Sequence, residues 1–176
     1  MKLIVARHGQ TEWNLQNRVL GRTDIPLNEK GKAQAAELAE NLAPIHIDHI
    51  YVSPLARAAE TGKIVAEICG AELSVREALI EHDFGAYEGV DRSDENYRLA
   101  KLSFAKRYPG GESYFDVAAR VYPFLKELRE LHPEDTVLIV THAAACRVIC
   151  SYFEDLGNEE LAAYTIPNCG YRVYHL

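Results

Sequence analysis

The sequence predicts an α/β fold, a three-layer α/β/α sandwich around a mostly parallel sheet. Short, continuously apolar runs recur along the chain, and such runs are typical of strands that are buried on both faces. Longer segments with apolar residues at helical spacing alternate with these runs, and alternating strands and helices favour parallel pairing. Two of the apolar runs end in a histidine, at His8 and His142, which places both imidazoles at one edge of the predicted sheet.

Length and composition predict one domain over residues 1–176. The chain has 176 residues, of which 48% are hydrophobic and 26% charged, enough to bury a sizeable core. No apolar run reaches the length of a membrane span and no signal-peptide pattern opens the chain, so we expect a cytoplasmic protein. A formal net charge of -7 argues against nucleic-acid or membrane partners. A phosphorylated ligand would need a local pocket of cations.

The cysteines do not predict a metal site. None of the four has the spacing of a metal finger, so small core residues in a reducing compartment are the favoured interpretation. We expect neither a metal nor another cofactor. The cysteines concerned are Cys69, Cys146, Cys150 and Cys169.

The first half of the chain shows clear helix boundaries. Asn28 is a suitable N-cap, and Gly70 is suited to the position after the end of a helix that begins at Leu55. The predicted elements are a strand over 2–7, a short helix over 12–18, a helix from Asn28 to about 42, a strand over 49–52, a helix over 55–69 and a strand over 73–75.

The second half contains a strong amphipathic stripe over 114–131, which predicts a long helix. A strand over 136–141, a helix to about 153 and a strand over 171–174 follow. The segment 81–111 is rich in Gly, Asp and Tyr and indicates mainly surface, with a helix around 94–107. This segment is a modest lid, and the sequence ends almost directly after the last strand, so we expect a fairly open site.

The first strand ends in a group of residues suited to an anion. Arg7 supplies a cation, His8 a nucleophilic imidazole and Gly9 a backbone that turns sharply and lets a ligand approach. Thr11 can cap the following helix and direct its amides toward the same place. A solvent-exposed strand end with a chance Arg-His pair is the alternative.

Two further residues are predicted to meet this group. Arg57 follows Ser53-Pro54 in the first turn of its helix, and His142 ends another strand. Two guanidinium groups suit a phosphoryl group, one imidazole can attack phosphorus, and the second, when protonated, can donate to an oxygen. Taken singly, Arg57 could be a surface charge and His142 a core histidine; taken together, the matching strand ends favour function.

These motifs, in this order, resemble the histidine phosphatase superfamily, which includes the bisphosphoglycerate-dependent phosphoglycerate mutases. The resemblance covers essentially the whole chain and implies a phosphoglycerate mutase-like fold. The blocks that carry it are Arg7-His8-Gly9-Gln10-Thr11 with Asn14, Gly21-Arg22-Thr23-Asp24-Ile25-Pro26-Leu27-Asn28 with Gly31, Ser53-Pro54-Leu55-Ala56-Arg57-Ala58, Val140-Thr141-His142, and Asn168.

The resemblance also implies roles for individual residues. His8 would be the nucleophile and form a phosphohistidine. Arg7, Arg57 and His142 would hold the phosphoryl oxygens, with Asn14 at the pocket wall.

The proton donor of the family is an acidic residue before an aromatic-glycine pair. Glu81-His82-Asp83-Phe84-Gly85 matches this pattern and indicates Glu81, with Asp83 as a weaker rival. One position departs from the family, because Ala143 stands where a glycine usually follows the second histidine. Its backbone N–H is retained for substrate binding, but its methyl group could narrow the phosphate pocket.

The predicted function is that of a metal-independent phosphatase. It hydrolyses the phosphomonoesters of small metabolites through a phosphohistidine intermediate. The nearest alternatives are a phosphoglycerate mutase and an alpha-ribazole phosphatase. A catalytically silent protein that binds phosphorylated ligands is an alternative from another class. Retention of the full set of reactive residues favours an enzyme.

Overall fold

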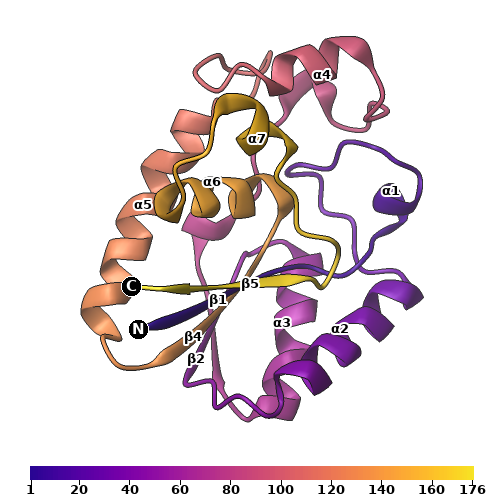
Figure 1. Ribbon diagram of the computed structural model, residues 1–176. Helices are drawn as coiled ribbons and strands as arrows, with labels where there is room; N and C mark the ends of the chain where they lie inside the picture. The colour runs from indigo at the N-terminus through magenta and orange to yellow at the C-terminus, as the bar shows by residue number, and fades with distance from the viewer.

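A computed structural model describes residues 1–176 and contains a five-stranded sheet with the order β3-β2-β4-β1-β5. Helices cover both faces of this sheet (Figure 1). In chain order the elements are β1 (Lys2–Arg7), α1 (Glu12–Leu15), α2 (Glu29–Leu42), β2 (His49–Val52), α3 (Ala56–Cys69), β3 (Glu72–Val75), the short 3₁₀ turns Glu77–Leu79 and Gly85–Tyr87, α4 (Glu95–Lys101), α5 (Tyr114–Leu131), β4 (Thr136–Thr141), α6 (Ala143–Phe153), α7 (Asn158–Ala163) and β5 (Tyr171–His175).

The sheet is mostly parallel, as the sequence predicted. β1 pairs in parallel with β4, and β2 pairs in parallel with both β4 and β3. β5 is the exception and runs antiparallel along the outer side of β1. The register sets Arg7 opposite Thr141, so His8 and His142 both follow directly after paired strand ends.

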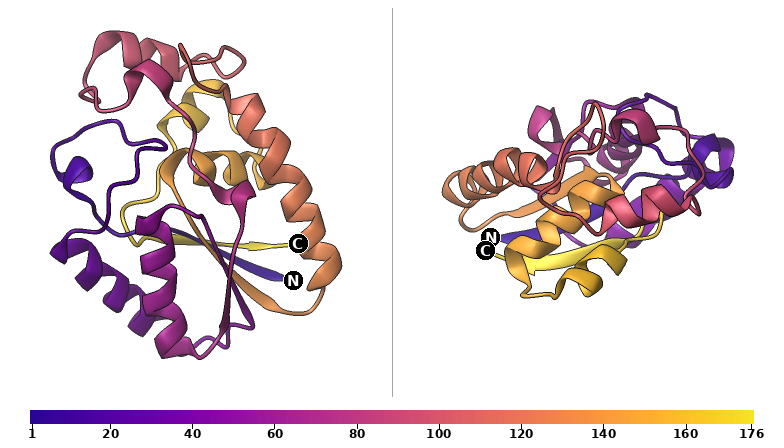
Figure 2. Two further views of the ribbon diagram at one scale, coloured as in Figure 1. Left: turned by 180° about the vertical axis from the view of Figure 1, so that it is seen from behind. Right: turned by 90° about the horizontal axis from the view of Figure 1, so that it is seen from above.

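Alternate side chains of the central strands enter two separate parts of the core. Leu3 and Ile139 pack on the side of α5 and α6, whereas Ile4 and Leu138 pack on the side of α2 and α3. All four are fully buried, and burial of each such side chain contributes about 1.5–3 kcal/mol to stability. Figure 2 shows α2 and α3 side by side on their face of the sheet. This two-sided burial explains why the strands are apolar throughout.

Most helices begin where the sequence predicted, since their capping residues act as expected. The Asn28 side chain accepts a hydrogen bond from the N–H of Gly31, and Gly70 has the positive φ of 69° that ends α3. Ser113 and Asp116 form a reciprocal capping box at the start of α5. No helix is long and apolar enough to cross a membrane.

Three helices differ from the prediction. α1 ends at Leu15 instead of residue 18, because Asn17 has a positive φ of 57° and the next residue pairs with Asp91. α4 ends at Lys101, and the following segment folds back as a loop in which Tyr108 is buried. α7 was not predicted, since it spans only six residues and lacks an apolar stripe. Figure 1 shows α7 between α4 and α6.

Candidate active site

A cavity of about 340 Å³ lies at the carboxyl end of β1 and β4. His8 and Arg7 reach it from the end of β1, and Ala143 from the first turn of α6. Glu81 enters from the segment after β3, and Asn14 from α1. The parallel arrangement of β1 and β4 brings these residues together although they are far apart in sequence.

His8 is held as a neutral imidazole with one free nitrogen. Its Nδ1 lies 2.6 Å from the carbonyl oxygen of Gly9, which can only accept, so Nδ1 carries the proton and Nε2 keeps a lone pair. Burial, reinforced by Arg57 and Arg7, holds the pKa of His8 well below its usual range. A neutral ring with an unprotonated Nε2 is the form that can attack phosphorus.

His142 lies beside His8, with 5.1 Å between the ring centroids. Its Nε2 is 2.7 Å from the Ser53 hydroxyl, so the residue that follows β2 orients the residue that follows β4. Burial, with Arg57 and His8 next in importance, holds the pKa of His142 well below its usual range. The imidazole is therefore neutral before a ligand enters, whereas the sequence analysis considered a protonated ring.

Arg7 and Arg57 supply permanent positive charge. Burial lowers the pKa of each to about 10, so both are charged at neutral pH. Arg57 is completely buried behind the cavity wall, where it donates to the carbonyl oxygens of Gly21 and Thr23. The interpretation of Arg57 as a surface charge is therefore wrong.

Several buried nitrogens around this site have no hydrogen-bond partner in the protein. Buried donors without partners carry a desolvation cost, which acceptor oxygens of a ligand would remove. Such a concentration of donors suits a phosphoryl group. The atoms concerned are Nε of Arg7, Arg57 and Arg147 and Nδ1 of His142.

The structure distinguishes the two candidate proton donors. Glu81 lines the cavity, is 3% exposed, and its carboxylate accepts from the backbone N–H groups of His82, Ala144 and Ala145. Asp83 does not line the cavity, and one of its oxygens instead accepts the N–H of Gly85. The geometry favours Glu81.

Gly9 is required for packing, and Thr11 caps α1 as predicted. A Cβ at Gly9 would collide with the backbone of Gly31, so this glycine permits close packing against α2 instead of the approach of a ligand. Thr11 caps its helix as predicted, but α1 has only four residues and offers no extended anion site. The side-chain amide of Asn168 donates two hydrogen bonds. One goes to Oδ1 of Asn14, the capping partner of Thr11, and the other to the backbone carbonyl of His8.

Ala143 lies at the cavity wall as the first residue of α6. The next two backbone N–H groups of the helix donate to Glu81, not to the interior of the cavity. Ala143 and His8 thus line the same cavity.

Sequence reasoning missed a group of cations in the wall of the cavity. Arg92, Arg98 and Lys101 come from the segment interpreted as surface, and Arg147 from α6. Tyr97 also contributes to this wall, although it is 9% exposed and packs against Phe84. The i, i+3 spacing of Arg98 and Lys101 was a signal in the sequence, but it gains meaning only when α4 is known to face His8.

The acidic chain thus contains the local pocket of cations that a phosphorylated ligand needs. Five basic side chains and one carboxylate, Glu81, line the same cavity. Ala163 and Thr165, in and after α7, also line the cavity.

Comparison with known proteins agrees with this geometry. Residues 3–176 match the histidine phosphatase superfamily, branch 1. The chain belongs to this superfamily. The fold that the resemblance implied is confirmed, because solved structures of phosphatases in this superfamily superimpose on nearly the whole chain.

Related histidine phosphatases include hydrolases and a mutase. Phosphoserine phosphatase 1 of Hydrogenobacter thermophilus is 34% identical over 100% of this chain and 87% of its own length. A 2,3-bisphosphoglycerate-dependent phosphoglycerate mutase of Cytophaga hutchinsonii is 32% identical over 98% of this chain and 86% of its own length.

Two solved structures illustrate the similarity of the fold. A mycobacterial glucosyl-3-phosphoglycerate phosphatase in complex with VO3 has a TM-score of 0.89 and 30% identity, covering 98% of this chain and 90% of its own. Phosphoserine phosphatase from Entamoeba histolytica in complex with 3-phosphoglyceric acid has a TM-score of 0.84 and 30% identity, covering 98% of this chain and 89% of its own.

The predicted activity is confirmed at the level of the reaction: the chain is a histidine phosphatase that acts on small phosphate monoesters.

Proposed function

We propose that this histidine phosphatase hydrolyses phosphate monoesters that carry a second anionic group, through a phosphohistidine at His8. The observation that carries the proposal is the excess of cations in one cavity. Besides His8, Glu81 and Arg7, the cavity is lined by Arg92, Arg98 and Lys101.

The first chemical step transfers the phosphoryl group to the enzyme. Nε2 of His8 attacks phosphorus, the bond from phosphorus to the ester oxygen breaks, and Glu81 gives its proton to the departing alkoxide. Two nitrogens that have no hydrogen-bond partner in the protein, Nε of Arg7 and Nδ1 of His142, stabilise the phosphoryl oxygens. Arg57, whose charge lowers the pKa of both His8 and His142, adds to the positive charge around the site.

The second step returns the enzyme to its starting state. Glu81, now a carboxylate, removes a proton from a water molecule, and the resulting hydroxide attacks phosphorus. The bond from Nε2 to phosphorus breaks, inorganic phosphate leaves, and His8 is again a neutral imidazole. Glu81 has regained its proton, so the cycle balances without a further reactant.

A second anion on the substrate gives Arg92, Arg98 and Lys101 a binding partner. Lys101 is half-buried, and burial together with Arg147 and Arg92 lowers its pKa to about 8. Cations brought close together in a partly buried wall repel one another, and a carboxylate between them would remove this cost. Among the relatives, the phosphoserine and 3-phosphoglyceric acid of the Entamoeba histolytica complexes each contain a carboxylate beside the phosphoester.

The test compares two substrates that differ only in the second anion. In glycerol 3-phosphate a hydroxymethyl group replaces the carboxylate of 3-phosphoglycerate. We expect kcat/KM for phosphate release to be about tenfold or more higher for 3-phosphoglycerate, the scale of one charged hydrogen bond. The double variant Arg98→Met, Lys101→Met should lose this preference and retain its rate on glycerol 3-phosphate.

Equal kcat/KM values for the two substrates in the unaltered enzyme would refute the second-anion site. Alpha-ribazole 5′-phosphate, which has no second anion, belongs in the same panel. A clear preference for it would favour the alpha-ribazole phosphatase alternative.

A further inference from the structure

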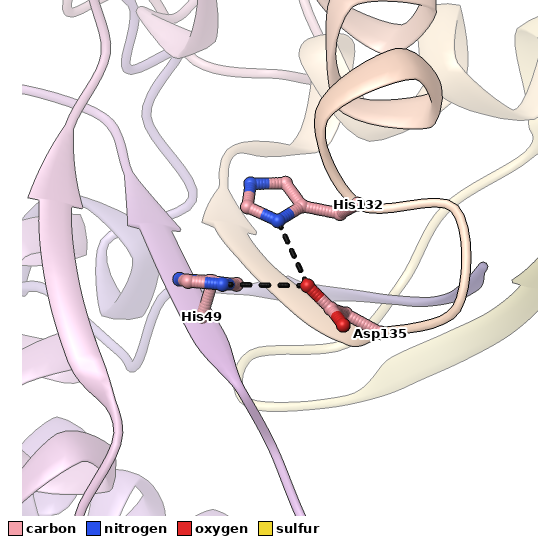
Figure 3. A group of neighbouring side chains, drawn as sticks. All are labelled: His49, His132 and Asp135. Atoms are coloured by element: carbon pink, nitrogen blue, oxygen red, sulfur yellow. Dashed lines mark hydrogen bonds and ion pairs between the residues drawn. The ribbon is translucent and has the colours of Figure 1, made fainter.

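A second cluster of reactive side chains lies at the edge of the sheet opposite to the active site. It consists of His49, His132 and Asp135, which lie at the start of β2, just after α5 and just before β4 (Figure 3). Asp135 precedes β4 and His142 follows it. The six residues of β4, at about 3.3 Å each, separate the two sites by roughly 20 Å.

The three side chains converge on a single oxygen. Oδ2 of Asp135 lies 2.9 Å from Nδ1 of His132 and 3.4 Å from Nε2 of His49. All three ligand atoms lie within 4.8 Å of one another. Atoms bound to one zinc ion at about 2.0–2.2 Å in a tetrahedron are separated by roughly 3.3–3.6 Å, so small side-chain rotations suffice to place an ion between them.

Backbone contacts hold two of these residues in place. Asp48 and Thr136, the neighbours of His49 and Asp135, are joined by two hydrogen bonds. The Asp48 N–H donates to the Thr136 carbonyl over 2.9 Å, and the Thr136 N–H donates to the Asp48 carboxylate over 2.8 Å. The cluster is therefore fixed by the sheet itself and does not depend on mobile side chains meeting by chance.

His132 has the outer partner that metal-bound histidines require. Its Nε2 lies 2.8 Å from the buried Tyr51 hydroxyl, on the opposite side of the ring from Asp135. An imidazole that binds a metal through Nδ1 carries its proton on Nε2 and donates it to such an oxygen. The hydroxyl oxygen of Tyr51 is placed to accept this hydrogen bond.

We propose that His49, His132 and Asp135 form a zinc site whose fourth ligand is water. Two imidazoles and one carboxylate are ligands typical of zinc, whereas magnesium and calcium prefer oxygen ligands alone. His49 and Asp135 are each about one-third exposed and His132 is 11% exposed. The cluster is thus open to solvent on one side, which admits the ion and the water.

The bound ion has a structural role. It joins the end of α5 to the starts of β2 and β4. Because the unfolded chain does not hold the three ligands together, binding adds to the stability of the fold. The site is independent of the phosphatase chemistry, which proceeds at the other edge of the sheet.

The test measures zinc uptake by the full chain after treatment with EDTA and buffer exchange. Calorimetric titration with zinc chloride should show one ion per chain. At a free zinc concentration of about 100 Kd the Tm should rise by about 5–10 °C. Cobalt as a probe should give the visible absorption of a tetrahedral site without a sulfur-to-cobalt band, since no cysteine is a ligand.

Variants assign the ion to this cluster. His49→Asn and Asp135→Asn should each weaken zinc binding by at least about tenfold and abolish the Tm increase, and circular dichroism checks that they fold. His46→Asn is the matched control, because His46 is an exposed neighbour that pairs with Asp48. His8→Ala controls for zinc at the active site. Absence of one-to-one uptake, or unchanged affinity in both His49→Asn and Asp135→Asn, would overturn the proposal.

Discussion

The carboxylate of Glu81 accepts a hydrogen bond from the backbone N–H of Ala145 over 3.2 Å. The N–H of Ala144 donates to the same carboxylate, so the first turn of α6 holds Glu81. Because α6 begins immediately after His142, one segment positions both His142, the imidazole proposed to bind the phosphoryl group, and Glu81, the proposed acid. The proposed phosphoryl-binding residue and the proposed proton donor are therefore held by the same part of the fold.

Glu81→Gln should lower kcat for alkyl phosphates by about a hundredfold or more, the scale expected when a general acid is lost. Glutamine keeps the size and one acceptor oxygen but cannot supply the proton. Aryl phosphates have better leaving groups and should lose less. Steady-state assays with the two substrate types measure the difference. Asp83→Asn is the control, and a larger loss in Asp83→Asn would show that Glu81 is not the acid.

His8→Ala should remove turnover and leave the fold intact. The substitution deletes the proposed nucleophile, and His8 contributes one short side-chain hydrogen bond, to Gly9. Phosphate release measures activity, and circular dichroism with thermal unfolding checks the structure. Activity above a trace in a folded His8→Ala protein would exclude the covalent mechanism.

The pH dependence should reveal Lys101. Its pKa is lowered to about 8, so it is charged at pH 7 and loses its charge as the pH rises through 8. We expect kcat/KM for 3-phosphoglycerate to fall between pH 7 and pH 9, because this parameter reports the free enzyme. Glycerol 3-phosphate should show a smaller fall. Lys101→Arg should remove the difference between the two substrates, and its persistence would assign the titration to another group.

Activity should survive exhaustive chelation with EDTA. The cavity is lined by arginines and one carboxylate, and guanidinium groups supply the charge that a metal would otherwise bring. A zinc ion at His49 would be removed by the same treatment, with a loss of Tm and no loss of activity at 25 °C. Restoration of lost activity by magnesium or zinc would contradict the prediction.

Water, and not the substrate, should be the usual acceptor of the phosphoryl group. A mutase keeps its intermediate enclosed while the substrate reorients. Here α4, which carries Arg98 and Lys101, is a helix of only seven residues. Product analysis with labelled phosphoglycerate distinguishes the two reactions. Formation of the isomer clearly faster than release of phosphate would assign the enzyme as a mutase.

The site residues that follow regular elements were predictable from the sequence. His8 and His142 end apolar strands, and Arg57 begins a helix, so strand and helix periodicity alone locates them. In contrast, the packing of Gly9 against Gly31 could not be predicted, because the two glycines are distant in sequence. Contacts between distant backbone segments leave no periodic signal.

The sequence by itself determined the α/β class, the mostly parallel sheet and the convergence of two histidines, because hydrophobic periodicity and strand ends are local properties. Only the tertiary structure decided which charges face His8. It placed Arg92, Arg98, Lys101 and Arg147 in the lining of the same cavity, although the first three belong to a segment that the sequence indicated as mainly surface. A cation on such a segment is equally compatible with solvent or with a cavity, and the packing of α4 over the sheet edge selects between them.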